Sequence, residues 1–288
     1  ILRAAVAANN RFGDKKPIYI VPVGIEYGSY FRYRSTCLIS YGKAINVTEF
    51  IKGLDVENEA QVMEPLRKEL ASRMSELISY VKDDENLYSK WSLTRILTCR
   101  FRDKGLAGNL SDNQSVIAQI ERAAEEHPAK MQELLDKAAA FDKKIDKADI
   151  DILSFKRKGL LFKAIWKGLA AIAGLPFFIF SAIAALPMWG AAWFIRRGLK
   201  DPAFGNTVNL GVKIVGTLIW LPLLTIALFL TTPWFIAAGS VLASIPAYSY
   251  FYDYQDFVRI LISDCRLMQR KDLCKEFKEI ENSFIDLL

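Results

Sequence analysis

The chain has 288 residues, enough for two structural units, and a modest formal net charge of +6. Its four cysteines lie far apart with no C-x-x-C spacing, which argues against a disulfide framework or a metal cluster, and no metal or prosthetic group is expected. Residues 1–160 are polar and charged, whereas 168–252 carry very few charges. Basic residues gather beside the apolar stretches, which favours anionic lipid headgroups over nucleic acid as the partner; a solvated charged face is the alternative.

Residues 1–50 predict a short helix and two strands. Residues 1–10 are rich in alanine and are expected to be helical. Residues 18–25 form an apolar, β-branched run that contains Pro22, which a helix interior would not accept. We therefore expect a buried strand of a mixed sheet there, and a second strand at 35–41 that ends before Gly42.

Residues 51–155 predict a soluble helical block. Apolar residues recur at three- and four-residue spacing, as in amphipathic helices. Because proline suits the first turn of a helix, regular helix is expected to begin near Pro65 in the first of these segments. Helices are expected at 59–82, 115–124 and 129–141, with loops at 83–86 and 105–111.

Residues 214–252 form an uncharged stretch that is too long for one membrane crossing. A hydrocarbon core of roughly 30 Å needs about 20 helical residues, so the length fits two crossings. Thr232 and Pro233 divide the stretch, as a cap and a first-turn residue of the second helix. We predict a helical hairpin with limbs at 214–231 and 233–250; a very apolar soluble core is the alternative.

Residues 168–195 are uncharged but are interrupted by Pro176 and Pro187. Both flanks are basic, which places both ends on the cytosolic side. A re-entrant or in-plane broken helix pair satisfies this condition, and a single crossing does not. The membrane-embedded region is thus expected to cover 156–252, followed by a charged cytosolic helix at 253–288. The basic flanking residues are Lys156, Arg157, Lys158, Lys163 and Lys167 before the stretch and Arg196, Arg197 and Lys200 after it.

Two short motifs carry a family resemblance. Ile-Val-Pro-Val-Gly-Ile at 20–25 and Tyr-Gly-Lys-Ala-Ile at 41–45 resemble the lysophospholipid acyltransferase family, of the 1-acylglycerol-3-phosphate acyltransferase type. Ala44 stands where that family usually has proline. The resemblance implies that 1–50 is the C-terminal part of an α/β acyltransferase domain. It also implies that Val21, Pro22 and Val23 line the acceptor site; packing within a core strand is the alternative for these three residues.

The catalytic motifs of that family are absent. Its His-x-x-x-x-Asp pair removes the proton from the acceptor hydroxyl, and its Glu-Gly-Thr-Arg motif holds the phosphate. The only histidine here, His127, is followed five positions later by Gln132, and it lies at an expected helix boundary where a solvated surface residue is favoured. The resemblance therefore implies an inactive fragment whose catalytic residues precede Ile1, with no catalytic residue in this sequence.

Arginines and aromatic residues alternate at 30–34. Guanidinium groups suit two-point contacts to phosphate, so Arg32 or Arg34 is a candidate to bind the phosphate of a lipid headgroup or acyl donor. A solvated strand edge is the alternative.

The resemblance implies a multi-pass enzyme of the inner (cytoplasmic) membrane, with its soluble part in the cytosol. It would transfer a fatty acyl group from an acyl-CoA or acyl-carrier-protein thioester, as co-substrate, to a lysophospholipid or glycerol-phosphate acceptor. The alternative function is a non-enzymatic, membrane-anchored scaffold whose helical block binds a partner protein.

Overall fold

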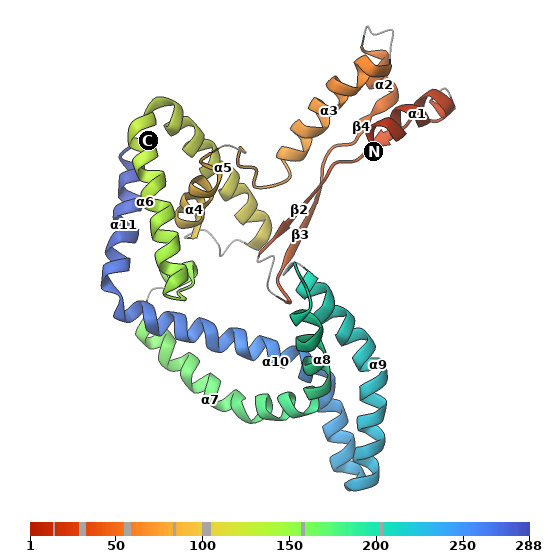
Figure 1. The fold of residues 1–288 in the computed structure, drawn as a ribbon, viewed down its shortest axis with the longest axis vertical. Helices are drawn as coiled ribbons and strands as arrows, with labels where there is room; N and C mark the ends of the chain where they lie inside the picture. Colours follow the sequence, from red (N-terminus) through yellow and green to blue (C-terminus); the bar gives the residue numbers. More distant parts are fainter. Residues whose placement is uncertain are drawn as a thin grey trace. The chain divides into compact units, whose positions relative to one another are not determined.

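The computed structural model describes residues 1–13, 15–28, 33–54, 59–82, 85–99, 105–156, 159–201 and 204–288 (Figure 1). The chain forms two compact units. The first unit comprises Ile1–Gly28, Thr36–Ala139 and Ile280–Leu288, and the second comprises Ser29–Ser35 and Ala140–Glu279. The first holds the strands and the second holds the long apolar helices.

The strands form two small antiparallel sheets. In one, β1 (Tyr19–Ile20) pairs with β4 (Ile45–Asn46); in the other, β2 (Val23–Tyr27) pairs with β3 (Cys37–Tyr41). The prediction of a mixed sheet was wrong, because every strand pair in the described residues is antiparallel. The strand expected at 18–25 is divided at Pro22, which has no N–H to donate to a ladder.

The expected buried strand is also largely exposed. Val23 is 37% exposed and Ile25 is 50% exposed, whereas Gly24 between them is buried. Side chains alternate between the two faces of a strand, so the glycine face is the covered one. Within the first unit, only one face of the two-stranded β2–β3 ribbon is packed.

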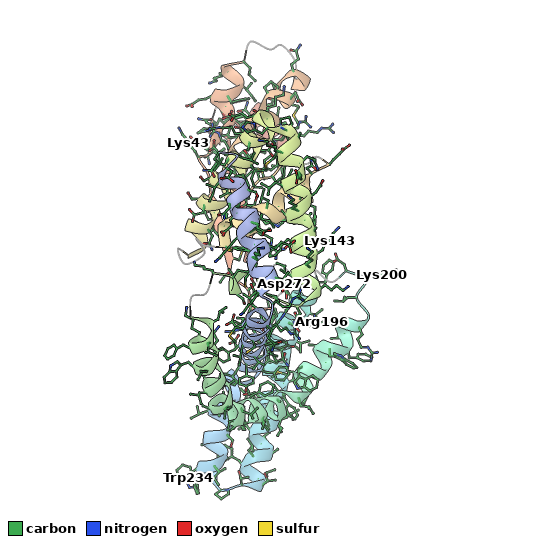
Figure 2. The ribbon with its side chains drawn as sticks, turned by 90° about the vertical axis from the view of Figure 1, so that its left-hand side faces the viewer. Lys43, Lys143, Arg196, Lys200, Trp234 and Asp272 are labelled. Carbon is green, nitrogen blue, oxygen red and sulfur yellow. The ribbon has the colours of Figure 1, made fainter. Side chains whose placement is uncertain are left out.

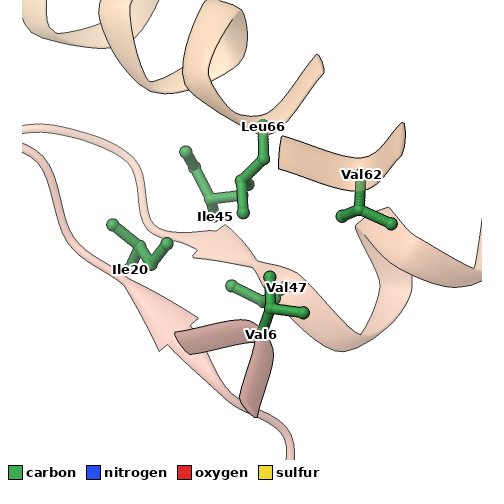
Figure 3. Close-up of a cluster of buried hydrophobic side chains, with 6 residues drawn as sticks. All are labelled: Val6, Ile20, Ile45, Val47, Val62 and Leu66. Carbon is green, nitrogen blue, oxygen red and sulfur yellow. The ribbon is translucent and has the colours of Figure 1, made fainter. Parts of the chain in front are cut away.

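A small apolar core joins the N-terminal elements (Figure 3). It unites α1 (Leu2–Phe12), the β1–β4 pair, α2 (Val47–Lys52) and α3 (Glu59–Ser75). Asn46 caps α2 by accepting a hydrogen bond from the Glu49 amide, as its residue type favours. The buried side chains are Val6, Ile20, Ile45, Val47, Val62 and Leu66.

The remaining helices of the helical block differ from prediction in extent. Helix α3 begins at Glu59 with Pro65 inside it and ends at Ser75, so the start expected near Pro65 and the end expected at 82 were wrong. The loop expected at 105–111 is helical, because α5 (Gly105–Glu126) begins there and buries Leu110. Packing overrides the low helix propensity of its glycines. Helices were confirmed at 115–124 and 129–141, within α5 and α6 (Pro128–Lys147); α4 (Leu87–Thr98) was not predicted.

The second unit contains a short 3-10 turn, η2 (Ile152–Ser154), followed by long helices. These are α7 (Leu160–Ala184), α8 (Leu186–Arg197), α9 (Gly205–Thr231), α10 (Trp234–Gln269) and the first part of α11 (Lys271–Ile285), whose residues from Ile280 onward belong to the first unit. Within the described residues, α7, α9 and α10 are long and apolar enough to cross a membrane. The chain is therefore mostly helical and suited to membrane association.

Helices α9 and α10 follow one another across a turn at Thr232 and Pro233 and pack together, as two limbs of a hairpin would, while their crossing of a membrane stays a prediction. Three details differ from prediction. Pro233 is the N-cap of α10 rather than a first-turn residue, and the Thr232 hydroxyl donates to the Leu228 carbonyl at the end of α9. Pro176 lies inside a continuous α7, so no break occurs there, whereas the break expected at Pro187 is found, with Ala185 between the helices and Pro187 in the first turn of α8. The C-terminal segment expected as one helix is divided between α10 and α11 at Arg270.

Candidate functional site

The three residues predicted to line an acceptor site do not face the same way. Val21 is 50% exposed and Val23 is 37% exposed, while Pro22 between them is buried. The Pro22 carbonyl accepts a hydrogen bond from the Gly42 amide at 2.9 Å. Within the first unit, therefore, these side chains do not converge on one cavity.

The two glycines of the resemblance motifs have a packing role. A Cβ added at Gly24 would lie 2.4 Å from the Leu77 carbonyl oxygen, and one added at Gly42 would lie 2.9 Å from Pro22 Cγ and 3.0 Å from Leu77 Cδ1. Neither position could accept a side chain without a shift of its surroundings. The two glycines thus let Leu77, in the segment after α3, pack directly on the β2–β3 ribbon.

A cavity of about 480 Å³ opens beside α4 in the first unit. Its volume falls within the roughly 300–1,000 Å³ that is usual for small-molecule pockets. The predicted residues 21–23 do not line it. The lining residues are Ile78, Ser79, Tyr80, Val81, Leu87, Tyr88 and Trp91.

Arg34 belongs to the second unit, and Arg32 lies outside the described residues. The Nε of Arg34 donates to Asp253 Oδ1 at 2.8 Å, and both side chains are about half exposed. Its backbone is left-handed, with φ of 62°, which is uncommon for a residue other than glycine. The guanidinium is thus held at the surface of α10 by a carboxylate.

Next to this ion pair lies a cluster of tyrosines. Tyr33 packs edge-on against Tyr248 and Tyr252, and the hydroxyl of Tyr252 lies 3.3 Å from Asn209 Oδ1. Asn209 and Tyr248 are each only 1% exposed. Burial raises the pKa of Tyr33, so its hydroxyl stays neutral and can donate a hydrogen bond.

Sequence reasoning missed two polar residues of α9: Asn209, which belongs to this cluster, and Lys213. Lys213 Nζ donates to Ser249 Oγ at 2.8 Å, one helical turn after Asn209. Two polar residues four apart in an apolar helix share one face, and polar groups at such positions are usually paired within the protein. That spacing was a detectable signal.

A buried polar network joins α7, α10 and the η2 turn. The carboxylate of Asp264 is fully buried and accepts hydrogen bonds from Lys167 Nζ at 2.6 Å and Ser154 Oγ at 2.7 Å. Ser263 Oγ lies 2.9 Å from Ser154 Oγ and accepts from the Asp151 amide. Lys167, expected among the lipid-facing basic residues, is instead engaged by Asp264.

The break between α7 and α8 is covered by protein on one side, while Leu186 on the other side is 53% exposed. Ala185 is fully buried and packs with Met188 and Tyr248. The indole N–H of Trp220 donates to the Ala184 carbonyl at 2.7 Å, and that of Trp189 donates to the Ala182 carbonyl at 3.2 Å. Carbonyls released by a helix break need such partners where water is excluded. The break is thus compatible with membrane depth.

His127 is exposed between α5 and α6, as the predicted helix boundary implied. Gln132, five positions later, bonds with Asn86 and Asp136. Among the described residues, no group of three or more His, Cys, Asp or Glu side chains could hold a metal ion. No protein-family model, curated protein or solved structure matches this chain.

Proposed function

We propose that this chain is the membrane-bound part of a phospholipid acyltransferase. Such an enzyme transfers a fatty acyl group from a thioester donor to the hydroxyl of a lysophospholipid or glycerol phosphate. The membrane part of the proposal rests on one observation, the long apolar helices α7, α9 and α10. The enzymatic part rests on the resemblance of residues 20–25 and 41–45.

Arg34 is the residue proposed to contact phosphate. Its contact with Asp253 uses Nε, and the terminal N–H groups of the guanidinium are the donors that would meet phosphate oxygens. The side chain is 42% exposed, so a lipid headgroup can reach it. The adjacent Tyr33 and Tyr252, which are partly exposed, are aromatic residues of the kind that is typical of a membrane interface, and both pack against the buried Tyr248.

Photocrosslinking to lysophosphatidate tests this role. The chain is reconstituted in phosphatidylethanolamine–phosphatidylglycerol vesicles with lysophosphatidate that carries a photoreactive acyl chain; a phosphate-free monoacylglycerol analogue is the control. One charge-assisted hydrogen bond is worth about 1.5–3 kcal/mol, so Arg34→Ala should weaken binding roughly ten- to hundred-fold. Arg34→Lys should weaken it less, because an ammonium keeps the charge but loses the planar fork.

Asp253→Ala is the matched control variant. It removes the ion pair but leaves the guanidinium free for phosphate, so binding should persist or strengthen. Equal losses in Arg34→Ala and Asp253→Ala would mean that the ion pair only holds the local structure. No loss in Arg34→Ala would remove this residue from the proposed site.

A second prediction concerns the chemistry. Acyl transfer to an alcohol needs a base for the hydroxyl proton, and the only histidine, His127, has glutamine rather than aspartate five positions later. We expect the reconstituted chain alone to transfer no labelled acyl group from acyl-CoA or acyl carrier protein. Transfer that survives His127→Ala would assign the chemistry to other residues of this chain.

A membrane-anchored scaffold is the second candidate, and the apolar cavity beside α4 favours it. Trp91 and Tyr88 on its wall are 37% and 49% exposed, a surface that suits a protein partner. In that case Trp91→Ala should abolish partner binding, and lysophosphatidate should crosslink without dependence on its phosphate.

A further inference from the structure

Helix α7 exposes a continuous apolar stripe. Phe162 and Trp166 are 67% and 58% exposed on one flank of this stripe. The stripe itself consists of six aliphatic side chains that are between 51% and 69% exposed: Leu161, Ile165, Leu169, Ile172, Ile179 and Ile183. At 3.6 residues per turn, their positions fall within roughly 80° of the helix circumference. So regular an exposed stripe marks an interaction surface.

The opposite face of α7 packs on α10. The hydroxyl of Tyr254 donates to the Ala171 carbonyl at 2.7 Å, and that of Tyr250 donates to the Gly174 carbonyl at 3.2 Å. A Cβ on Gly174 would lie 2.6 Å from the Tyr250 oxygen, so glycine permits this close approach. The packed face therefore combines small residues with Phe177 and Phe178, whose rings contact aromatic rings of α10, whereas the stripe consists of exposed aliphatic residues.

The part of α10 beside α7 is charged. It carries Asp253, Asp256 and Arg259, and further on Asp264, which bonds to Lys167 of α7. A charged residue at the centre of a bilayer costs about 2.5–3.5 kcal/mol even on the most lenient scale. If α7 crossed the bilayer, the charged part of α10 that packs on it would enter the hydrocarbon too. Each of its charged residues would then add a free-energy cost of this kind.

The path of α10 indicates a different arrangement, in which α7 does not cross the bilayer. In Figure 1, the first half of α10 runs back along α9, and its second half turns away from this hairpin and lies side by side with α7. Pro246 lies inside α10, and proline bends helices. Figure 2 shows Trp234 at the far tip of the hairpin. A bilayer that contains the hairpin would therefore meet α7 lengthwise.

Basic and aromatic residues in the same unit indicate that the apolar stripe contacts a lipid surface. Lys163 on α7 is exposed, and so are Arg196 and Arg197 at the end of α8. The Arg197 guanidinium lies 4.5 Å from the centre of the Trp193 ring. Paired tryptophan and arginine side chains of this kind suit an anionic membrane interface.

We propose that α7 lies in the plane of the membrane interface, with its apolar stripe among the upper acyl chains, and that it does not cross the bilayer. The α9–α10 hairpin then supplies the crossings. This proposal deepens the membrane part of the proposed function and does not depend on its enzymatic part.

Depth measurement by fluorescence quenching tests the proposal. The native cysteines are replaced by serine, and a polarity-sensitive fluorophore is attached to a cysteine introduced at Ile165, Ile172 or Ile179 on the stripe. Vesicles of phosphatidylethanolamine and phosphatidylglycerol contain lipids that are spin-labelled high or low on the acyl chain. Leu223, 54% exposed near the middle of the α9 limb, is the control for a deep position, and Ala170, exposed about 160° around the helix from Ile172, is the control for the side away from the stripe.

All three stripe positions should be quenched about two-fold more by the shallow than by the deep label, since in-plane helices insert only about 5–10 Å. Leu223 should show the reverse order, and Ala170 should be quenched least. Quenching by the deep label that peaks at Ile172 would mean that α7 crosses, and an absence of quenching at the stripe would mean that protein covers it; either result overturns the proposal. Loss of lysophosphatidate crosslinking would count against the function and leave these depths unchanged.

Discussion

Replacing Lys167 by methionine would isolate the ion pair that joins α7 to α10. Asp264 is fully buried and accepts hydrogen bonds from Lys167 and Ser154, whereas the side chain of Lys167 is 22% exposed. Methionine keeps most of the apolar stem and removes the charge. The substitution therefore removes a cation from a buried carboxylate and changes little else.

The expected loss of stability follows from the difference in burial between Asp264 and Lys167. Removal of one partner from a buried ion pair costs about 3–5 kcal/mol, because the remaining charge stays desolvated. Asp264→Asn keeps the size of the side chain and leaves a lysine that can turn toward water, so the loss should be roughly 1.5–3 kcal/mol. In the Lys167→Met/Asp264→Asn double variant no charge is buried, so it should be more stable than Lys167→Met alone.

The assay is unfolding of the detergent-solubilised chain, followed by tryptophan fluorescence. A Trp91→Phe background restricts the signal to the second unit, which holds the other five of the six tryptophans. Lys163→Met, at an exposed position one turn earlier, is the matched control and should change the free energy of unfolding by less than about 0.5 kcal/mol. Equal effects of Lys163→Met and Lys167→Met, or additive effects in the double variant, would refute the reasoning.

Two further predictions follow from the second unit. A hydrogen bond from Arg266 to Asp149 lowers the pKa of that carboxyl, so its stabilising contribution is present above the ordinary pKa of aspartate and is lost as the pH falls through the lowered value. Asp149→Asn should therefore be less stable than the parent at neutral pH and equal to it in strong acid; a difference that is independent of pH would contradict this. Cysteines introduced at Lys200 and Lys275 should both escape an impermeant thiol reagent in intact cells, since both positions are expected on the cytosolic side. Labelling at Lys200 alone would indicate that the α7–α8 segment crosses the membrane once. Asp103, expected on the same side, lies outside the described residues.

The sequence by itself determined the long apolar helices and the hairpin. The length of the uncharged run at 214–252, compared with the thickness of a bilayer, required two limbs, and the turn at Thr232 and Pro233 was found where it was expected. The α1 helix and the helical boundary at His127 were also visible, because alanine content, periodicity and breaking residues act over a few neighbouring positions.

Only the tertiary structure decided which side chains meet. Lys167 reads as one of several basic flanking residues until Asp264, 97 positions later, is placed beside it. Likewise, the glycines of the resemblance motifs gain their packing role from Leu77, which no local pattern connects to them. Hydrophobic length and periodicity are properties of a short segment, whereas the partner of a charge or of a glycine depends on contacts between distant segments.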